Sequence, residues 1–307
     1  MLGTTDARRI DTSSLLAAWE RARAEGLNNR AAAAKLGMSE AELIAAGCGR
    51  FVTRLLPDAL ALLRSLPGLG EIKAVVRNAA AVIERAGTVQ GVEANGVGAI
   101  LVEADNFEMV CEIAQWKKGF ALREDSTRGR GLKLSVQFFT AEGTSAAKFF
   151  LRPGGDVQAF AQLVGALASP DESSQESIDA RPAQFSLPLQ QRLAPTAPGA
   201  LLAFLQTAAQ SRQALTFVAR NRAACLSTSK TIERVKRSDR GGWVNVLDDE
   251  MDIHLNGDGI RYLRPVADPD ADGGWLHWFS DQQAVALSVR CRQGWTELMR
   301  ATNSVNS

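Results

Sequence analysis

The sequence has few of the side chains that most often act as general bases or metal ligands. Its 307 residues include two histidines, His254 and His277, and one tyrosine. A site built from three histidine ligands is therefore excluded, and few groups remain that could titrate near neutral pH. The charges are also nearly balanced, with 35 Lys and Arg against 34 Asp and Glu. Such a chain has no overall field that would attract nucleic acid or an anionic membrane.

Cysteine pairs and long apolar runs are lacking too. The four cysteines are at positions 48, 111, 225 and 291, and no two of them form a CxxC motif. No histidine lies near any of them in the sequence at the spacing typical of metal ligands. We interpret them as small buried apolar residues. No apolar run approaches the roughly 18 residues that span a bilayer, and the opening MLGTTDARRIDTSS has no apolar core of a secretory signal. We therefore expect a soluble cytoplasmic protein with no membrane partner.

The patterns that are present indicate an α+β fold. Residues 13–47, 58–66 and 155–168 have helical periodicity, and Ser39 with Glu42 three residues later forms a capping box. Between the second and third of these segments, residues 71–151 are short β-rich runs separated by Gly, Asn and Asp. This pattern predicts an antiparallel meander.

The order of elements then returns, which predicts a tandem duplication. Arg77-Asn78 recurs in the second half as Arg220-Asn221, and Phe138-Phe139 recurs at nearly the same spacing as Trp278-Phe279. We predict two antiparallel β-sheet units with packed helices. The first repeat, with a helical lead-in, spans residues 1–168, a Pro-, Ser- and Gln-rich linker spans 169–199, and the second repeat, with a shortened lead-in, spans 200–307.

Several short stretches, in order over nearly the whole chain, resemble the haemin-degrading factor family. The first half contains LGMSEAEL, GEIKAVVRN, AAVIERAG, AQW and SVQFF, and the second half contains FVARNR, TIERV, GGWVNV, MDIHL and WTEL. The resemblance implies two similar α+β units that bind one haem in a cleft. Members of the family handle haem in the bacterial cytoplasm during haem and iron utilisation, and some are reported to degrade it.

The chain departs from this family at the residues that face the haem iron. The family's axial histidine lies on the helical lead-in of the second half, and residues 169–199 contain no histidine. Val110 stands where the family has an arginine that faces the iron, and Ile83 stands where a histidine is common. Because the axial ligand sets the reactivity of haem iron, we expect haem binding or transfer and assign no catalytic residue.

The resemblance implies that cationic partners for the haem propionates are retained. Arg264 matches a basic residue that precedes a proline, and Arg292, with Arg290 as its close competitor, matches a late arginine. An arginine fork suits a carboxylate. His254, at the position equivalent to Val110, is a candidate replacement iron ligand, although a structural histidine of the strand is the simpler interpretation. We interpret His277, between two tryptophans, as a histidine on the solvent side of a strand or in a hydrogen-bond network.

Two functions other than haem trafficking remain open from the sequence. One is a degenerate scaffold or regulatory module that binds a partner protein without haem, and the other is a haem-degrading enzyme with a substituted ligand. Besides haem itself, a haem donor or acceptor protein is an expected partner.

The segment AAAKLGMSEAEL is similar to a helix–turn–helix, but the near-neutral charge argues against nucleic acid as a partner. A calcium loop typically starts with acidic residues at alternate positions, as do Asp268, Asp270 and Asp272. Phe279, however, stands where such a loop needs glutamate, so we interpret the segment as a polar turn.

Overall fold

The structure is a computed structural model that describes residues 12–94, 99–125, 131–180, 193–238 and 241–304. Its α-helices are α1 (Thr12–Ala24), α2 (Asn29–Lys35), α3 (Glu40–Ala45), α4 (Ala59–Ser65), α5 (Val157–Leu167), α6 (Ala200–Gln210) and α7 (Trp295–Ser304), and two short 3-10 helices are η1 (Leu66–Leu69) and η2 (Ile113–Gln115). In these ranges, no helix has the length and apolar character needed to cross a membrane.

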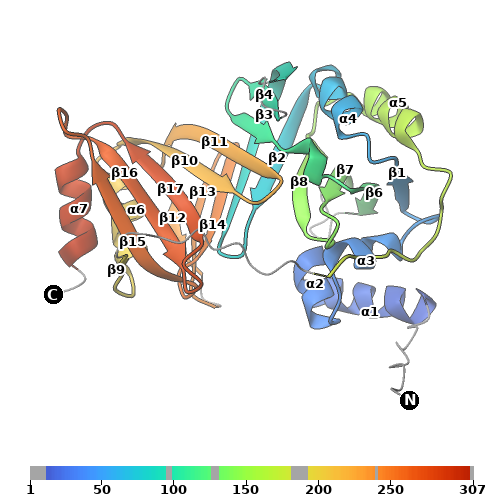
Figure 1. The fold of residues 1–307 in the computed structure, drawn as a ribbon, viewed down its shortest axis with the longest axis horizontal. Helices are drawn as coiled ribbons and strands as arrows, with labels where there is room; N and C mark the ends of the chain where they lie inside the picture. Colours follow the sequence, from blue (N-terminus) through green and yellow to red (C-terminus); the bar gives the residue numbers. More distant parts are fainter. Residues whose placement is uncertain (1–11, 95–98, 126–130, 181–192, 239–240, 305–307) are drawn as a thin grey trace.

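The strands form two large antiparallel sheets that share one long strand, β3 (Figure 1). Sheet A runs, in spatial order, β1 (Val52–Leu55), β6 (Lys118–Asp125), β7 (Leu132–Phe139), β8 (Ser145–Leu151), β2 (Glu71–Arg77), β3 (Ala81–Ala94), β14 (Met251–Asn256), β13 (Trp243–Asp248) and β12 (Val235–Arg237). Sheet B runs β9 (Ala194–Pro195), β15 (Ile260–Ala267), β16 (Gly274–Ser280), β17 (Val285–Cys291), β10 (Ala214–Arg220), β11 (Ala224–Thr231), β5 (Glu108–Cys111), β4 (Ile100–Ala104) and the end of β3.

The two halves of the chain exchange strands in a reciprocal way. In the first half, β5 pairs with β11 of the second half and places Val110 opposite Cys225. In the second half, β14 pairs with β3 of the first half and places His254 opposite Val82. Val82 and Cys225 are separated by the same interval as the two Arg-Asn motifs, so they occupy equivalent positions of the repeats. The predicted equivalence of His254 and Val110 therefore agrees with the strand register, and the predicted α+β duplication is confirmed.

The repeated Arg-Asn motifs lie where the two halves meet. The side-chain amide of Asn78 donates to the carbonyls of Arg220 (3.1 Å) and Ala286 (2.8 Å) in the second half. The side-chain amide of Asn221 donates to the carbonyl of Arg77 in the first half at 3.0 Å. Each asparagine also accepts backbone N–H groups of its own turn through Oδ1. The motif thus closes a turn and joins the halves at the same time.

The predicted aromatic pairs also occupy matching places. A β-bulge lies between Phe138 and Phe139 on β7, and another lies between Trp278 and Phe279 on β16. Phe138 belongs to the main core and Phe139 to the separate cluster around Phe120, so both are buried because both faces of this part of the sheet are covered. Trp278 and Phe279 are buried as well.

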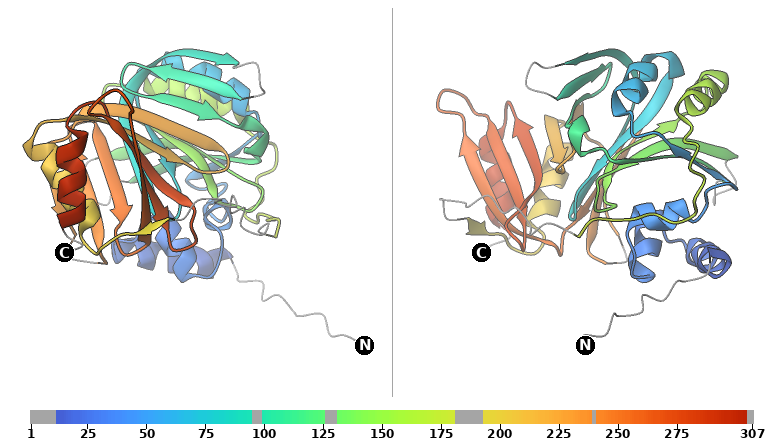
Figure 2. Two further views of the ribbon diagram at one scale, coloured as in Figure 1. Left: turned by 60° about the vertical axis from the view of Figure 1, so that its left-hand side comes forward. Right: turned by 45° about the vertical axis from the view of Figure 1, so that its right-hand side comes forward.

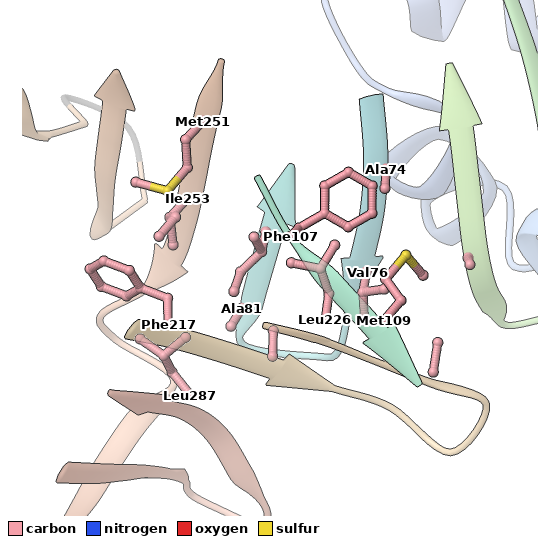
Figure 3. Packing of buried hydrophobic residues seen from close by; sticks show 14 of the residues in the cluster. Ala74, Val76, Ala81, Phe107, Met109, Phe217, Leu226, Met251, Ile253 and Leu287 are labelled. Carbon is pink, nitrogen blue, oxygen red and sulfur yellow. The ribbon is translucent and has the colours of Figure 1, made fainter. Parts of the chain in front are cut away.

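One continuous apolar core runs through both halves. It contains Leu62 of α4 and Phe160 of α5 against sheet A, and Phe204 of α6 and Leu298 of α7 against sheet B. Figure 3 shows its middle, where side chains of β2, β5, β10, β11 and β14 face one another. We call the face of each sheet that carries this core the inner face and the opposite face the outer face.

A separate apolar cluster covers the outer face in the first half. Trp19 of α1, Ala33 of α2 and Ile44 of α3 pack with Phe120 and Phe139 of the sheet. These helices lie across the sheet from α4 and α5 (Figures 1 and 2). The predicted capping box is present, because the Ser39 hydroxyl accepts the N–H of Glu42 and the Glu42 carboxylate accepts the N–H of Ser39. The predicted boundaries of the repeats and the linker stay predictions, and residues 181–192 of the linker lie outside the described residues.

Candidate functional site

The outer face of sheet B lacks the layer of helices that covers the outer face of sheet A in the first half, among the described residues. The cluster built on α1, α2 and α3 has all its buried members between Leu16 and Phe139, in the first half. The helices of the second half, α6 and α7, pack on the inner face. Among the described residues, no helix therefore covers the outer face of β15, β16 and β17 as α1, α2 and α3 cover the first sheet.

The strand register shows what this difference exposes. In sheet A, Phe120 pairs with Gln137, and both are buried, at 0% and 1% exposure. In sheet B, the matching pair is Arg264 and His277, and both are half-buried. The position that is sealed by helices in the first repeat is thus covered by no described helix in the second.

His277 points to the outer face because of strand alternation. Its neighbours Leu276 and Trp278 are fully buried on the inner face, where Trp278 packs against Phe204 of α6 with ring centroids 6.1 Å apart. Successive side chains of a strand point to opposite faces. The ring of His277 therefore lies among outward-facing side chains, and its Nδ1 is 2.8 Å from the hydroxyl of Ser288 on β17.

The surroundings of His277 favour a neutral imidazole. Burial, and after it the positive charge of Arg264, hold the pKa of His277 below its ordinary value. A neutral imidazole has one N–H and one lone pair, and a hydrogen bond at one nitrogen determines which atom carries which. If Nδ1 donates to Ser288, the lone pair is on Nε2, for which the described residues provide no hydrogen-bond partner.

Trp275 adds a flat aromatic surface beside His277. The two rings are stacked, with centroids 5.9 Å apart and planes within 4°. The guanidinium of Arg290 lies 5.7 Å from the centroid of Trp275. Arg290 also makes two hydrogen bonds to the Asp268 carboxylate, at 2.8 and 2.7 Å. Its charge is therefore already partnered, so it could bind another anion only by sharing or losing that ion pair.

The structure brings three of the four sequence-predicted residues to one region. Arg264 lies on β15 next to His277, and among the described residues it takes part in no ion pair. Arg290 lies on β17 opposite Trp275, and Arg292 follows the end of β17 with an exposed side chain. Their role as propionate partners stays a prediction.

His254 is not part of this region. It lies on β14 in sheet A, and its Nδ1 is 2.8 Å from the side-chain oxygen of Asn245 on β13. The adjacent row of the same face carries Asp252 opposite Glu84. The charged groups of this row are therefore Asp252 and the ion pair of Glu84 with Lys73.

Two surface hollows lie elsewhere on the molecule. One, of about 200 Å³, lies between the start of α6 and β13 and includes Arg237, Asp258 and Arg261. The other, of about 220 Å³, lies beside α1 and includes Trp19 and Glu124. Both are smaller than the roughly 300–1,000 Å³ of typical ligand pockets, and none of the four predicted site residues lines either one. The region around Arg264 is an open face rather than a closed pocket.

The cysteines provide no metal site. Cys111, Cys225 and Cys291 are each held as thiols, because burial raises their pKa. The part of the chain described by the structure contains no group of three or more His, Cys, Asp or Glu side chains that could hold a metal ion. The segment from Asp268 to Gly273 forms the turn between β15 and β16, as predicted: Asp268 pairs with Arg290, and Asp272 accepts the N–H of Thr296 at 2.9 Å.

Sequence reasoning missed the most complete arrangement on this face. His277 was expected to be a network or solvent-side histidine, and its bond to Ser288 fits that interpretation. Its proximity to Arg264 depends on the pairing of β15 with β16, and its exposure depends on the missing helical cover. The alternation WLHWFS was the available signal, because it places Trp275 and His277 on one face and Leu276 on the other.

Comparisons with known proteins support the family resemblance noted in the sequence. Residues 37–167 match the haemin-degrading HemS.ChuX domain. The chain is 32% identical over 161 residues to the hemin transport protein HmuS of Yersinia pestis, a match that covers 52% of this chain and 46% of HmuS. It is 33% identical over 129 residues to the hemin transport protein HemS of Yersinia enterocolitica, covering 42% of this chain and 37% of HemS. The matches thus span less than half the length of these curated relatives.

The similarity in three dimensions extends over both halves. The fold superposes on that of holo-PhuS, a heme-binding protein from Pseudomonas aeruginosa, with a TM-score of 0.83 and 26% identity, covering 94% of this chain and 98% of PhuS. The resemblance noted in the sequence is therefore confirmed. Residues 37–167 form a domain of the haemin-degrading HemS/ChuX family.

Proposed function

We propose that the protein binds haem on the outer face of sheet B in its second half and passes it to another protein. The observation that carries the proposal is the open row of Arg264 and His277 beside Trp275, on a fold similar to that of a heme-binding protein. A haem molecule is flat and apolar at its centre and carries two carboxylates at one edge. The apolar indole of Trp275 and the nearby arginines match these two properties.

Arg264 is the side chain best placed to bind a propionate. It is half-buried, it lies beside the aromatic pair, and no carboxylate among the described residues neutralises it. Arg290 is held by Asp268, and Arg292 is exposed at the edge of the face. We therefore assign the main electrostatic contact to Arg264 and supporting roles to the other two. A cytoplasmic location and a haem donor or acceptor as partner belong to the same proposal.

A haem titration followed in the Soret band tests the proposal. The wild-type chain should shift the Soret band at micromolar protein and haem. Arg264→Glu should weaken binding about tenfold or more, because a charge-assisted hydrogen bond contributes roughly 1.5–3 kcal/mol. Arg261→Glu is the matched control, since Arg261 lies on the same strand, points away from this face and lines the hollow near α6.

The outcomes separate the proposal from the alternative of a partner-binding scaffold. Binding by the wild type that is weakened by Arg264→Glu and not by Arg261→Glu supports the outer face as the site. An unchanged haem spectrum with the wild-type chain would overturn haem binding and leave the scaffold. Equal weakening by both variants would remove the assignment to this face.

A further inference from the structure

The haem-binding proposal leaves open which atom, if any, binds the iron. The chain has two histidines, and the structure places them on different sheets. Each has its Nδ1 within 2.8 Å of a side-chain oxygen of the neighbouring strand, Asn245 for His254 and Ser288 for His277. Hydrogen-bond geometry alone therefore does not distinguish them, and the distinction must come from their surroundings.

Charge separates the two histidines. The propionates make haem an anionic ligand. His254 shares its face with Asp252 and Glu84, which lie opposite each other on β14 and β3. His277 lies directly opposite Arg264. An anionic ligand that approaches His254 meets the carboxylate of Asp252 and the ion pair of Glu84 with Lys73. One that approaches His277 meets the guanidinium of Arg264, which forms no ion pair with the described residues.

Shape and access favour His277 as well. Trp275 stacks on the imidazole, with planes within 4°, so the ring is held in one orientation. Ser288 fixes its Nδ1 end, and a partner at the second nitrogen is the usual way in which proteins orient a metal-binding imidazole. The matching position of the first repeat, Gln137, is sealed at 1% exposure beneath α1, α2 and α3, but His277 remains half-exposed. A planar ligand can therefore reach Nε2 of His277 on this face, whereas the matching Gln137 is buried.

We propose that Nε2 of His277 is the axial ligand of the haem iron, with Ser288 orienting the ring and Arg264 pairing with a propionate. This inference rests on the proposed function and deepens it. The bond is a coordinate one, in which the Nε2 lone pair binds the iron and no redox step or proton transfer is needed.

The test compares haem with a porphyrin that has no metal. Purified full-length wild type, His277→Ala and His254→Ala are each titrated with ferric haem and with protoporphyrin IX. We expect His277→Ala to lose the wild-type Soret position and to bind haem at least tenfold more weakly. We expect it to bind protoporphyrin IX within twofold of the wild type, because only the iron contact is removed. His254→Ala, the matched control, should behave as wild type with both ligands.

Two further measurements strengthen the assignment. Added imidazole should restore the wild-type Soret position to the His277→Ala complex, since it can occupy the space of the deleted ring. His277→Gln, a polar substitution of similar size, serves the same test if the alanine variant does not fold, with circular dichroism as the check on folding.

Failure of the inference and failure of the proposed function give different results. If His277→Ala binds haem with the wild-type spectrum and affinity, His277 is not the ligand, but haem binding stands. If His254→Ala instead loses the spectrum, the ligand is on sheet A. If the wild type binds neither haem nor protoporphyrin IX, the proposed function falls and the inference falls with it.

Discussion

At the scale of single residues, Asn78 and Asn221 have the clearest structural role. The amide of Asn221 donates to three backbone carbonyls, those of Arg77 (3.0 Å), Ser145 (3.2 Å) and Ala146 (2.9 Å). Its side-chain oxygen accepts the N–H groups of Ala223 and Ala224 at 2.8 and 2.9 Å. Few other side chains carry two donors and an acceptor at so short a reach, which explains why the same residue stands at both repeats.

We therefore predict that Asn221→Ala destabilises the protein by about 2–4 kcal/mol, because several partly buried backbone groups lose their hydrogen-bond partners. Asn221→Asp should be at least as damaging, since it retains the acceptor but turns a negative oxygen toward carbonyl oxygens. Urea denaturation followed by circular dichroism measures both. If the alanine variant were no less stable than an ordinary surface substitution, the turn would not need this side chain.

At the scale of elements, the pair of strands β3 and β14 carries an unfavourable contact. Asp252 lies directly opposite Glu84. Burial, and next the negative charge of Glu84, raise the pKa of Asp252. Burial also opposes the ionisation of Glu84, but the ion pair with Lys73 outweighs it and holds the pKa of Glu84 below its ordinary value. The pKa values of the two carboxyl groups thus shift in opposite directions, because among the described residues Glu84 forms an ion pair with Lys73 and Asp252 forms none.

These shifts predict that Asp252→Asn stabilises the protein at pH 7 by about 0.2–1 kcal/mol, the usual size of a cross-strand like-charge contact. A raised folded-state pKa lowers stability above that pKa, and the cost disappears as the pH falls and Asp252 becomes protonated. The gain should therefore be seen in urea denaturation at pH 7 and should vanish near pH 3. Lys73→Ala gives the opposite control, because it removes the partner that stabilises Glu84. A destabilised Asp252→Asn variant at pH 7 would contradict this interpretation.

At the scale of the whole molecule, the two halves are built into one another. Sheet A takes β12, β13 and β14 from the second half, and sheet B takes β4 and β5 from the first. The main core contains residues of both, from Leu55 to Leu298. Separating the halves would leave long unpaired strand edges and expose apolar surface, both of which favour aggregation.

This arrangement predicts a single cooperative unfolding transition. Calorimetry of the full chain should show one peak, with calorimetric and van't Hoff enthalpies in agreement. Fragments 1–180 and 193–307 should aggregate when each is produced alone and should form a soluble complex when produced together. Two separate transitions, or a soluble and folded single fragment, would mean that the strand exchange contributes little to stability.

Much of the architecture could be predicted from local patterns. The capping box at Ser39, the meander after residue 70, the returning Arg-Asn motif and the turn at Asp268 all depend on residues close in sequence, and all are present in the structure. The candidate site was harder to predict. Arg264 is a candidate through the resemblance, whereas strand alternation predicts only that His277 lies on the solvent side or in a hydrogen-bond network.

The sequence by itself determined which segments become helices and strands and that the chain repeats. Those features follow from side-chain periodicity and short-range hydrogen bonding, which act within a few residues. Only the tertiary structure decided that β5 and β14 change sheets, that Arg264 lies opposite His277, and that no helix in the described part of the chain covers this row. Those features arise from pairing between distant strands, where the position of a side chain depends on a register that no local pattern contains. The scarcity of histidine therefore became informative only once the fold had shown which of the two lies beside an arginine on an open face.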